Sequence, residues 1–178
     1  CDIGAGLGAT RLVFGSPANR QRNGLDEGRA HDMALDFFRR LGNIAQAAGV
    51  CICLEAVATH YRCDFMNTTA SSIALAQELS HPAIAITLDT ANLQMNGESI
   101  DSVLPAHAGL IGHIHASEKD LVPLGEGDVP HAECAAAMRR HLPADQVVCV
   151  EILSGSADPQ FIGIRKSLSV ARCYHDTH

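Results

Sequence analysis

The chain has 178 residues, of which 47% are hydrophobic, and a formal net charge of −7 at pH 7. This length suffices for one domain with a substantial core, so we expect a single domain over residues 1–178. The acidic balance argues against a nucleic-acid backbone or an anionic membrane as the main partner. The sequence has no run of about 18 apolar residues and no basic-then-apolar leader, which predicts no membrane span, no secretory signal and a cytoplasmic location.

Short apolar runs alternate with segments of helical periodicity along the chain. We expect strands over residues 10–14, 50–55, 83–89, 110–115 and 146–151, and helices over residues 30–48, 68–79, 100–104, 132–140 and 159–174. After Asp89 we expect a polar loop. Gly4, Gly6 and Gly8 precede the first strand instead of following one, so they are not a dinucleotide fingerprint. The alternation predicts an α/β fold made of βα units around a parallel sheet.

Four of the predicted strands end in a residue that can bind a metal ion. These residues are Glu55, Asp89, His115 and Glu151. In parallel α/β folds the carboxyl ends of the strands form the active face, and residues two apart on a strand point the same way. We therefore expect the four side chains to meet at one point.

Three carboxylates that crowd together repel one another unless a cation lies between them. Three oxygen ligands and one imidazole suit one divalent ion, namely Mn²⁺, Mg²⁺, Co²⁺ or Zn²⁺. Taken singly, an acidic residue after a strand is often just a helix cap or a solvated loop residue. His113 points to the same face as His115, where a core or supporting histidine is a better interpretation than a fifth ligand.

At these residues the chain resembles the xylose isomerase-like barrel superfamily, in particular its sugar phosphate isomerase/epimerase group. The resemblance implies a TIM-type (β/α) barrel of eight strands, of which the five strands here match the fourth to the eighth. This partial barrel indicates either a fragment or a naturally shortened barrel, and we expect a homo-oligomer that covers its open edges. The motifs that carry the resemblance are Leu12-Val13-Phe14-Gly15-Ser16-Pro17 with Arg20, Leu54-Glu55 with Tyr61 and Cys63-Asp64-Phe65-Met66-Asn67-Thr68, Leu88-Asp89-Thr90, Gly112-His113-Ile114-His115, Gly125-Glu126-Gly127 and Val150-Glu151.

The resemblance implies a metal-dependent isomerase or epimerase that acts on a sugar or sugar phosphate by proton transfer through a cis-enediolate. Glu55 and Glu151 would remove and return the carbon-bound proton, while Asp89 and His115 would mainly hold the ion. Family members often have His three residues after the metal-binding Asp, where this chain has Asn92, which cannot shuttle a proton. The candidate substrate contacts are Arg20, Asn67, Asn92, His113, Glu118 and Lys119.

Two alternatives stay open at this point. The first is a non-catalytic remnant, a partial barrel that binds metal or sugar without turnover. The second is a metal-dependent phosphodiesterase similar to the endonuclease IV branch, because Asp128 and His131 follow His115 at spacings close to the pattern of that branch. About three zinc ions per chain would favour the nuclease, and one ion would favour the isomerase.

Overall fold

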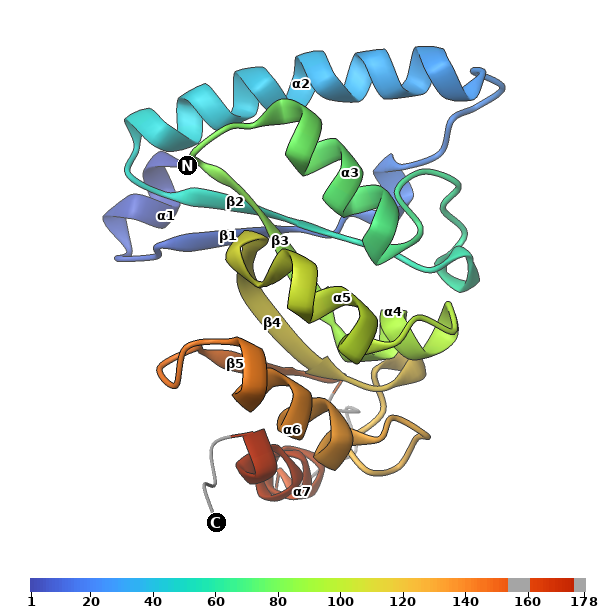
Figure 1. Cartoon of the computed structure of the whole chain (residues 1–178), viewed down its shortest axis with the longest axis vertical. Coiled ribbons are helices and arrows are strands. Elements are labelled where there is room, and N and C mark those ends of the chain that lie inside the picture. The colour runs from blue at the N-terminus through green and yellow to red at the C-terminus, as the bar shows by residue number, and fades with distance from the viewer. Residues whose placement is uncertain (154–160, 175–178) are drawn as a thin grey trace. The chain divides into compact units, whose positions relative to one another are not determined.

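The computed structural model of the protein describes residues 1–153 and 161–174 (Figure 1). Strands and helices alternate along the chain. The strands are β1 (Arg11–Phe14), β2 (Cys51–Glu55), β3 (Ile84–Asp89), β4 (Ile111–Ser117) and β5 (Val148–Glu151). The α-helices are α1 (Asp2–Gly6), α2 (Glu27–Ala47), α3 (Thr69–Leu79), α4 (Thr90–Met95), α5 (Ile100–His107), α6 (His131–His141) and α7 (Ile162–Ala171). The 3₁₀ turns are η1 (Pro17–Asn19), η2 (Thr59–Tyr61), η3 (Ala108–Leu110), η4 (Lys119–Leu121) and η5 (Arg172–Tyr174).

The five strands form one sheet in the order β1-β2-β3-β4-β5. The pairs β1–β2, β2–β3 and β4–β5 are parallel. Parallel neighbours in sequential order require a crossover between each pair, and a helix supplies it every time. This arrangement confirms the predicted α/β fold of consecutive βα units.

The chain divides into two compact units. The first comprises Cys1–Thr87 and Gly109–His113, and the second comprises Leu88–Ala108 and the described residues after His113. A single domain over residues 1–178 stays a prediction from the sequence.

In the first unit α2 and α3 contact each other and β2 (Figure 1). The side chain of Asp26 accepts a hydrogen bond from the Arg29 amide and so begins α2. Thr68 and Ser71 form a capping box at the start of α3. The rings of Phe14, Phe37 and Phe38 pack with centroids 5.1 to 5.9 Å apart, so the side chains of β1 and α2 share one aromatic cluster.

In the second unit α6 contacts α5 and η5, and α7 contacts β5. The predicted loop after Asp89 is wrong, because residues 90–95 form α4. Asp89 is the N-cap of this helix, and only six residues are too few to show helical periodicity in the sequence. Within residues 1–153 and 161–174, none of the helices has the length and apolar character that a membrane crossing requires.

Candidate metal centre

Three of the four predicted ligands lie on strands of the second unit. Asp89 ends β3 and Glu151 ends β5, as predicted. The prediction that β4 ends at His115 is wrong, because the strand continues to Ser117. His115 pairs in register with Cys149, and Ser117 pairs with Glu151. His115 and Glu151 therefore point to the same face of the sheet, which confirms the predicted alternation.

The side chains of Asp89, His115 and Glu151 converge. His115 Nδ1 lies 3.1 Å from a Glu151 carboxylate oxygen and 4.0 Å from Asp89 Oδ2. One ligand atom from each of the three residues lies within 4.8 Å of the others. Divalent ions bind such atoms at about 2.0–2.2 Å, so one ion fits between them.

The exposure of these side chains differs. Asp89 is buried, the His115 side chain is 12% exposed, and the Glu151 side chain is 40% exposed. Two carboxylates and one imidazole are ligands for Mn²⁺, Mg²⁺, Co²⁺ or Zn²⁺, and they do not favour one of these ions over the others. Glu151 is the candidate ligand most open to a molecule that arrives from solvent.

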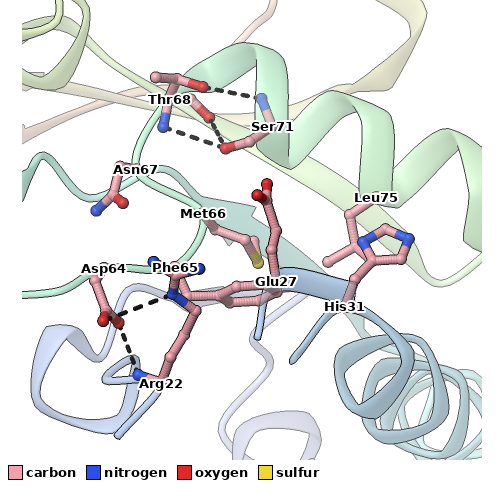
Figure 2. A pocket seen from close by; sticks show the side chains of 10 residues that line it. All are labelled: Arg22, Glu27, His31, Asp64, Phe65, Met66, Asn67, Thr68, Ser71 and Leu75. Atoms are coloured by element: carbon pink, nitrogen blue, oxygen red, sulfur yellow. Dashed lines mark hydrogen bonds and ion pairs between the residues drawn. The ribbon is translucent and has the colours of Figure 1, made fainter. Parts of the chain in front are cut away.

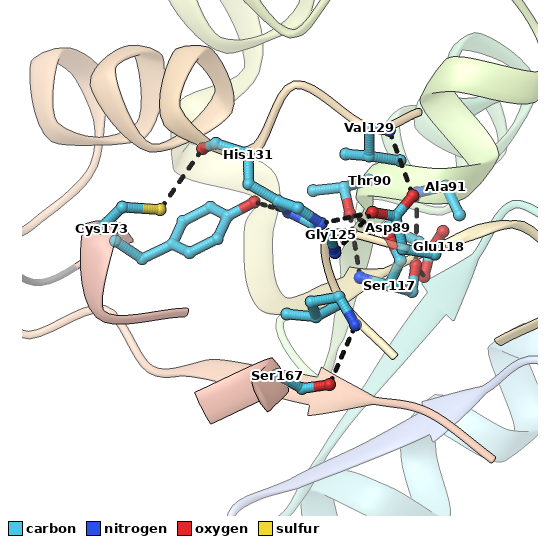
Figure 3. Close-up of polar contacts among 12 residues, drawn as sticks. Asp89, Thr90, Ala91, Ser117, Glu118, Gly125, Val129, His131, Ser167 and Cys173 are labelled. Atoms are coloured by element: carbon cyan, nitrogen blue, oxygen red, sulfur yellow. Dashed lines mark hydrogen bonds and ion pairs between the residues drawn. The ribbon is translucent and has the colours of Figure 1, made fainter. Parts of the chain in front are cut away.

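Asp89 also does what its position after a strand suggested, since it caps a helix. Its Oδ2 accepts a hydrogen bond of 2.6 Å from the Ser117 hydroxyl (Figure 3). Its Oδ1 accepts one of 2.6 Å from the backbone amide of Asn92. These two bonds hold the carboxylate in one orientation. Capping and metal binding are therefore compatible at this residue.

The fourth predicted ligand, Glu55, ends β2 in the first unit. It is buried and pairs in register with Thr87 of β3. A Cβ atom added to Gly15 would lie 2.6 Å from a carboxylate oxygen of Glu55, so this carboxylate occupies space that only glycine leaves open. The motif Phe14-Gly15 thus has a steric role beside Glu55.

Arg20 was predicted to contact the substrate, but its guanidinium lies buried among backbone carbonyls of the first unit. Nη1 donates to the Glu55 carbonyl oxygen at 2.5 Å, and Nη2 donates to the Phe14 carbonyl oxygen. Burial lowers the pKa of Arg20 to about 10, although Glu55 opposes this shift. The side chain joins the ends of β1 and β2, so in this structure it supports the scaffold.

Glu118 was also predicted to contact the substrate, and in the structure its carboxylate bonds within the second unit. It is fully buried. Its two oxygens accept hydrogen bonds from the amides of Gly125 (3.0 Å) and Val129 (3.1 Å), and one oxygen lies 3.1 Å from His131 Nε2 (Figure 3). Glu118 therefore anchors the loop that follows η4, while the neighbouring Lys119 is exposed.

The other predicted substrate contacts are placed as follows. The side-chain Nδ2 of Asn67 donates hydrogen bonds to the carbonyl oxygens of Val57 (2.8 Å) and Cys63 (3.1 Å). Asn67 also lines a pocket of about 300 Å³ in the first unit (Figure 2). Asn92 is buried on α4, and His113 is half-buried on β4. A role of these residues in substrate binding stays a prediction.

Comparison with known proteins identifies the family of this chain. The family model described as "Xylose isomerase-like TIM barrel" matches residues 1–172. The chain belongs to this family. Its match also confirms the resemblance to the xylose isomerase-like superfamily that the strand-end motifs indicated.

Relatives of this xylose isomerase-like chain include sugar epimerases. A D-psicose 3-epimerase of Ruminiclostridium cellulolyticum is 24% identical over 107 residues, which cover 60% of this chain and 36% of that protein. An L-ribulose 3-epimerase of a Methylomonas species is 28% identical over 127 residues, which cover 71% of this chain and 41% of that protein. The chain thus spans less than half of the length of these curated relatives.

Solved structures support the same fold for the xylose isomerase-like chain. The structure of a D-psicose 3-epimerase from Clostridium cellulolyticum H10, solved with D-tagatose, matches with a TM-score of 0.77 at 16% identity. The match covers 99% of this chain and 68% of that one. This likeness confirms the predicted partial TIM-type barrel.

Sequence reasoning missed two residues of this xylose isomerase-like site. Ser117 donates its hydroxyl to Asp89, and the Thr90 hydroxyl bonds to the main chain of Ser117. The strand alternation carried a signal for Ser117, because it lies two residues beyond His115 on the same face. That signal was hidden by the assumption that β4 ends at His115.

His131, which the endonuclease alternative required as a ligand, has other partners. Its Nδ1 lies 2.7 Å from the Tyr174 hydroxyl, and its Nε2 lies 3.1 Å from Glu118. Burial lowers the pKa of His131, and Glu118 partly opposes this shift. Both ring nitrogens are engaged within the fold, which argues against metal binding by His131 in this family member.

Proposed function

We propose that this chain forms the metal-binding part of an enzyme that epimerises or isomerises a sugar or sugar phosphate by proton transfer next to a carbonyl group. The observation that carries the proposal is the convergence of the ligand atoms of Asp89, His115 and Glu151. The sugar epimerases among the relatives give the reaction class. Because the chain spans only part of those relatives, the activity of the whole protein is part of the proposal.

We propose that Asp89, His115 and Glu151 hold one divalent ion and that Glu55 is the fourth ligand. The strand register supports Glu55. It pairs with Thr87, and Asp89 follows two residues later on the same strand and points to the same side. When bound, the ion would supply positive charge that stabilises the oxygen on which negative charge develops as the carbon loses its proton.

Glu55 and Glu151 are the proposed base and acid. A residue that transfers a proton must reach the substrate, and the Glu151 side chain is the most exposed of the three ligands in the second unit. Asp89 is held by two hydrogen bonds of 2.6 Å each, which suits a residue that keeps one orientation. His115 contacts Glu151 and would share the task of holding the ion.

The substrate contacts are proposed with one revision. Asn67, Asn92, His113 and Lys119 remain candidates for hydrogen bonds to sugar hydroxyls. Arg20 and Glu118 are assigned to the scaffold, because their polar groups bond to main-chain atoms. A cytoplasmic location stays a prediction from the composition.

The test incubates the chain in D₂O with ketoses or their phosphates and with Mn²⁺, Mg²⁺, Co²⁺ or Zn²⁺. NMR then measures how fast the carbon-bound hydrogen of the sugar exchanges for deuterium. The wild-type chain should catalyse exchange with at least one of these ions. Glu151→Gln should abolish it, since an amide cannot accept the proton. Glu133→Gln, an exposed position on α6, is the matched control and should leave the rate unchanged.

Each failure of this test has a defined meaning. Exchange that persists in Glu151→Gln would refute the acid–base assignment. Metal-dependent thermal stabilisation without turnover on the whole panel would support the non-catalytic alternative. A content of about three zinc ions per chain, with cleavage of a phosphodiester, would support the endonuclease alternative.

We propose further that the chain self-associates through its sheet edges. β1 and β5 are the outer strands of the sheet. Large apolar side chains are exposed near β1 on Val13, Met33 and Phe37, and Val147 is exposed next to β5. An open strand edge with apolar neighbours favours pairing with another chain. Light scattering over a dilution series should reveal an oligomer, and a stable monomer at all concentrations would refute this point.

A further inference from the structure

Ser117 ends β4 next to the proposed metal centre, and its side chain is fully buried in the second unit. We infer that Ser117 is a positioning residue, which fixes the carboxylate of Asp89 for metal binding through its hydroxyl group. The inference rests on the proposed function, because it assigns Asp89 to a metal ion. It goes beyond that function by naming what orients the ligand.

The hydrogen bonds around Ser117 determine the direction of its hydroxyl proton. The amide of Ala91 donates to Ser117 Oγ at 3.2 Å, so the oxygen acts as an acceptor on that side. The single hydroxyl proton then points to Asp89 Oδ2, which lies 2.6 Å away. A bond of this length to a carboxylate is in the range of charge-assisted hydrogen bonds, which are stronger than neutral ones.

Thr90, the residue after Asp89, holds the main chain of Ser117 through two hydrogen bonds. The Thr90 hydroxyl donates to the Ser117 carbonyl oxygen at 2.9 Å, and the Ser117 amide donates to the Thr90 hydroxyl oxygen at 2.9 Å. Both side chains are buried. Three hydrogen bonds therefore connect Ser117, at the end of β4, to Thr90 and Ala91 of α4, and a fourth connects it to the Asp89 carboxylate (Figure 3).

The other oxygen of Asp89 is held from α4. Asp89 Oδ1 accepts the Asn92 amide at 2.6 Å. Rotation of the carboxylate about its last bond would break both the bond to Ser117 and the bond to Asn92. Ser117 bonds to a candidate ligand residue and not to the ion. Removing a partner of this kind typically lowers metal affinity or activity about 10–100-fold, and we expect the same magnitude for Ser117.

The experiment compares Ser117→Ala with Ser167→Ala. Ser167 is a matched control, because it is also fully buried in the second unit, accepts the Leu124 amide at 2.9 Å and donates to the Gly163 carbonyl oxygen at 2.8 Å. Three quantities are measured on both variants: Mn²⁺ affinity by calorimetry, the visible spectrum of bound Co²⁺, and amide hydrogen exchange of the metal-free protein by NMR.

The expected result is a Mn²⁺ dissociation constant raised about 10–100-fold in Ser117→Ala, with a changed Co²⁺ spectrum. In the metal-free Ser117→Ala chain, the backbone amide proton of Asn92 should also exchange faster with solvent, although its acceptor, Asp89, is not mutated. Ser167→Ala should match the wild type in all three measurements. A purely structural role of Ser117 would affect both variants alike.

The inference is overturned if Ser117→Ala binds Mn²⁺ as Ser167→Ala does and exchanges its Asn92 amide at the wild-type rate. If the wild-type chain binds no divalent ion, the proposed metal centre fails, while the exchange of the Asn92 amide still decides whether Ser117 orients Asp89. If Ser117→Ala does not fold, Thr90→Val removes the two hydrogen bonds between Thr90 and Ser117 with an isosteric side chain. It should then give a loss of Mn²⁺ affinity, and unchanged affinity would refute the inference.

Discussion

Gly127→Ala tests the role of the buried Glu118 carboxylate. A Cβ atom at residue 127 would lie 2.3 Å from an oxygen of Glu118 and 2.8 Å from its carboxyl carbon. Because Glu118 is fully buried, its carboxylate cannot move aside into solvent. The loop must shift instead, and the nearest bond to break is the one from the Val129 amide, 3.1 Å long, to the same oxygen.

The expected loss of stability follows from that bond. A hydrogen bond to a charged group contributes about 1.5–3 kcal/mol to the free energy of unfolding. In a chain of this size about 1 kcal/mol corresponds to roughly 2–4 °C, so the melting temperature should fall by about 3–12 °C. Thermal unfolding followed by circular dichroism measures this change.

Gly109→Ala is the control for the same substitution. Nothing lies within 4 Å of a Cβ atom added at Gly109, and the residue is exposed. Its melting temperature should stay near that of the wild type, because surface substitutions usually change stability by less than about 0.5 kcal/mol. If Gly127→Ala melts together with Gly109→Ala, the Glu118 carboxylate does not anchor the loop.

Three further predictions concern the pH dependence, the buried tyrosine and the first unit. Burial lowers the pKa of His131 below its unfolded value of about 6.5, so the contribution to stability is present above about pH 6.5 and is lost as the pH falls from there through the lowered pKa; urea unfolding of His131→Gln should lack this dependence. Tyr174→Phe removes the hydroxyl at 2.7 Å from His131 and should lower the free energy of unfolding by about 1 kcal/mol, whereas an unchanged urea midpoint would contradict that bond. Gly15→Ala should displace the Glu55 carboxylate, which lies 2.6 Å from the added Cβ, and reduce hydrogen exchange of the substrate about 100-fold while circular dichroism reports a retained fold. Wild-type exchange in Gly15→Ala would refute the role of Glu55.

The positions of the candidate ligands could be predicted because they depend on local rules. A parallel strand places its last residue at the active face, and the period of two selects the side that the residue points to. Those rules predict that Asp89, His115 and Glu151 lie on one side of their strands, and their ligand atoms lie close together in the structure. The helices of more than ten residues were predicted equally well, since their apolar positions repeat several times.

The supporting contacts could not be predicted, because each depends on residues that are distant in the chain. Glu118 stands beside Lys119 and Asp120, so its sequence surroundings resemble an exposed loop. Its partners follow 7 to 13 residues later, and only the folded loop brings them to the carboxylate. Arg20 likewise has a distant partner, because it donates a hydrogen bond to the carbonyl oxygen of Glu55, 35 residues away. A single sequence does not distinguish such a buried charged side chain from a solvated one.

The contact between Tyr174 and His131 gives the protein a built-in optical reporter. The chain has no tryptophan and only two tyrosines. Tyr61 belongs to the first unit and Tyr174 to the second, so each unit carries its own fluorophore. In Tyr61→Phe the remaining emission would come from a phenol 2.7 Å from an imidazole, and it would change when the loop anchored by Glu118 opens. The opening of one unit could then be followed separately from the melting of the other.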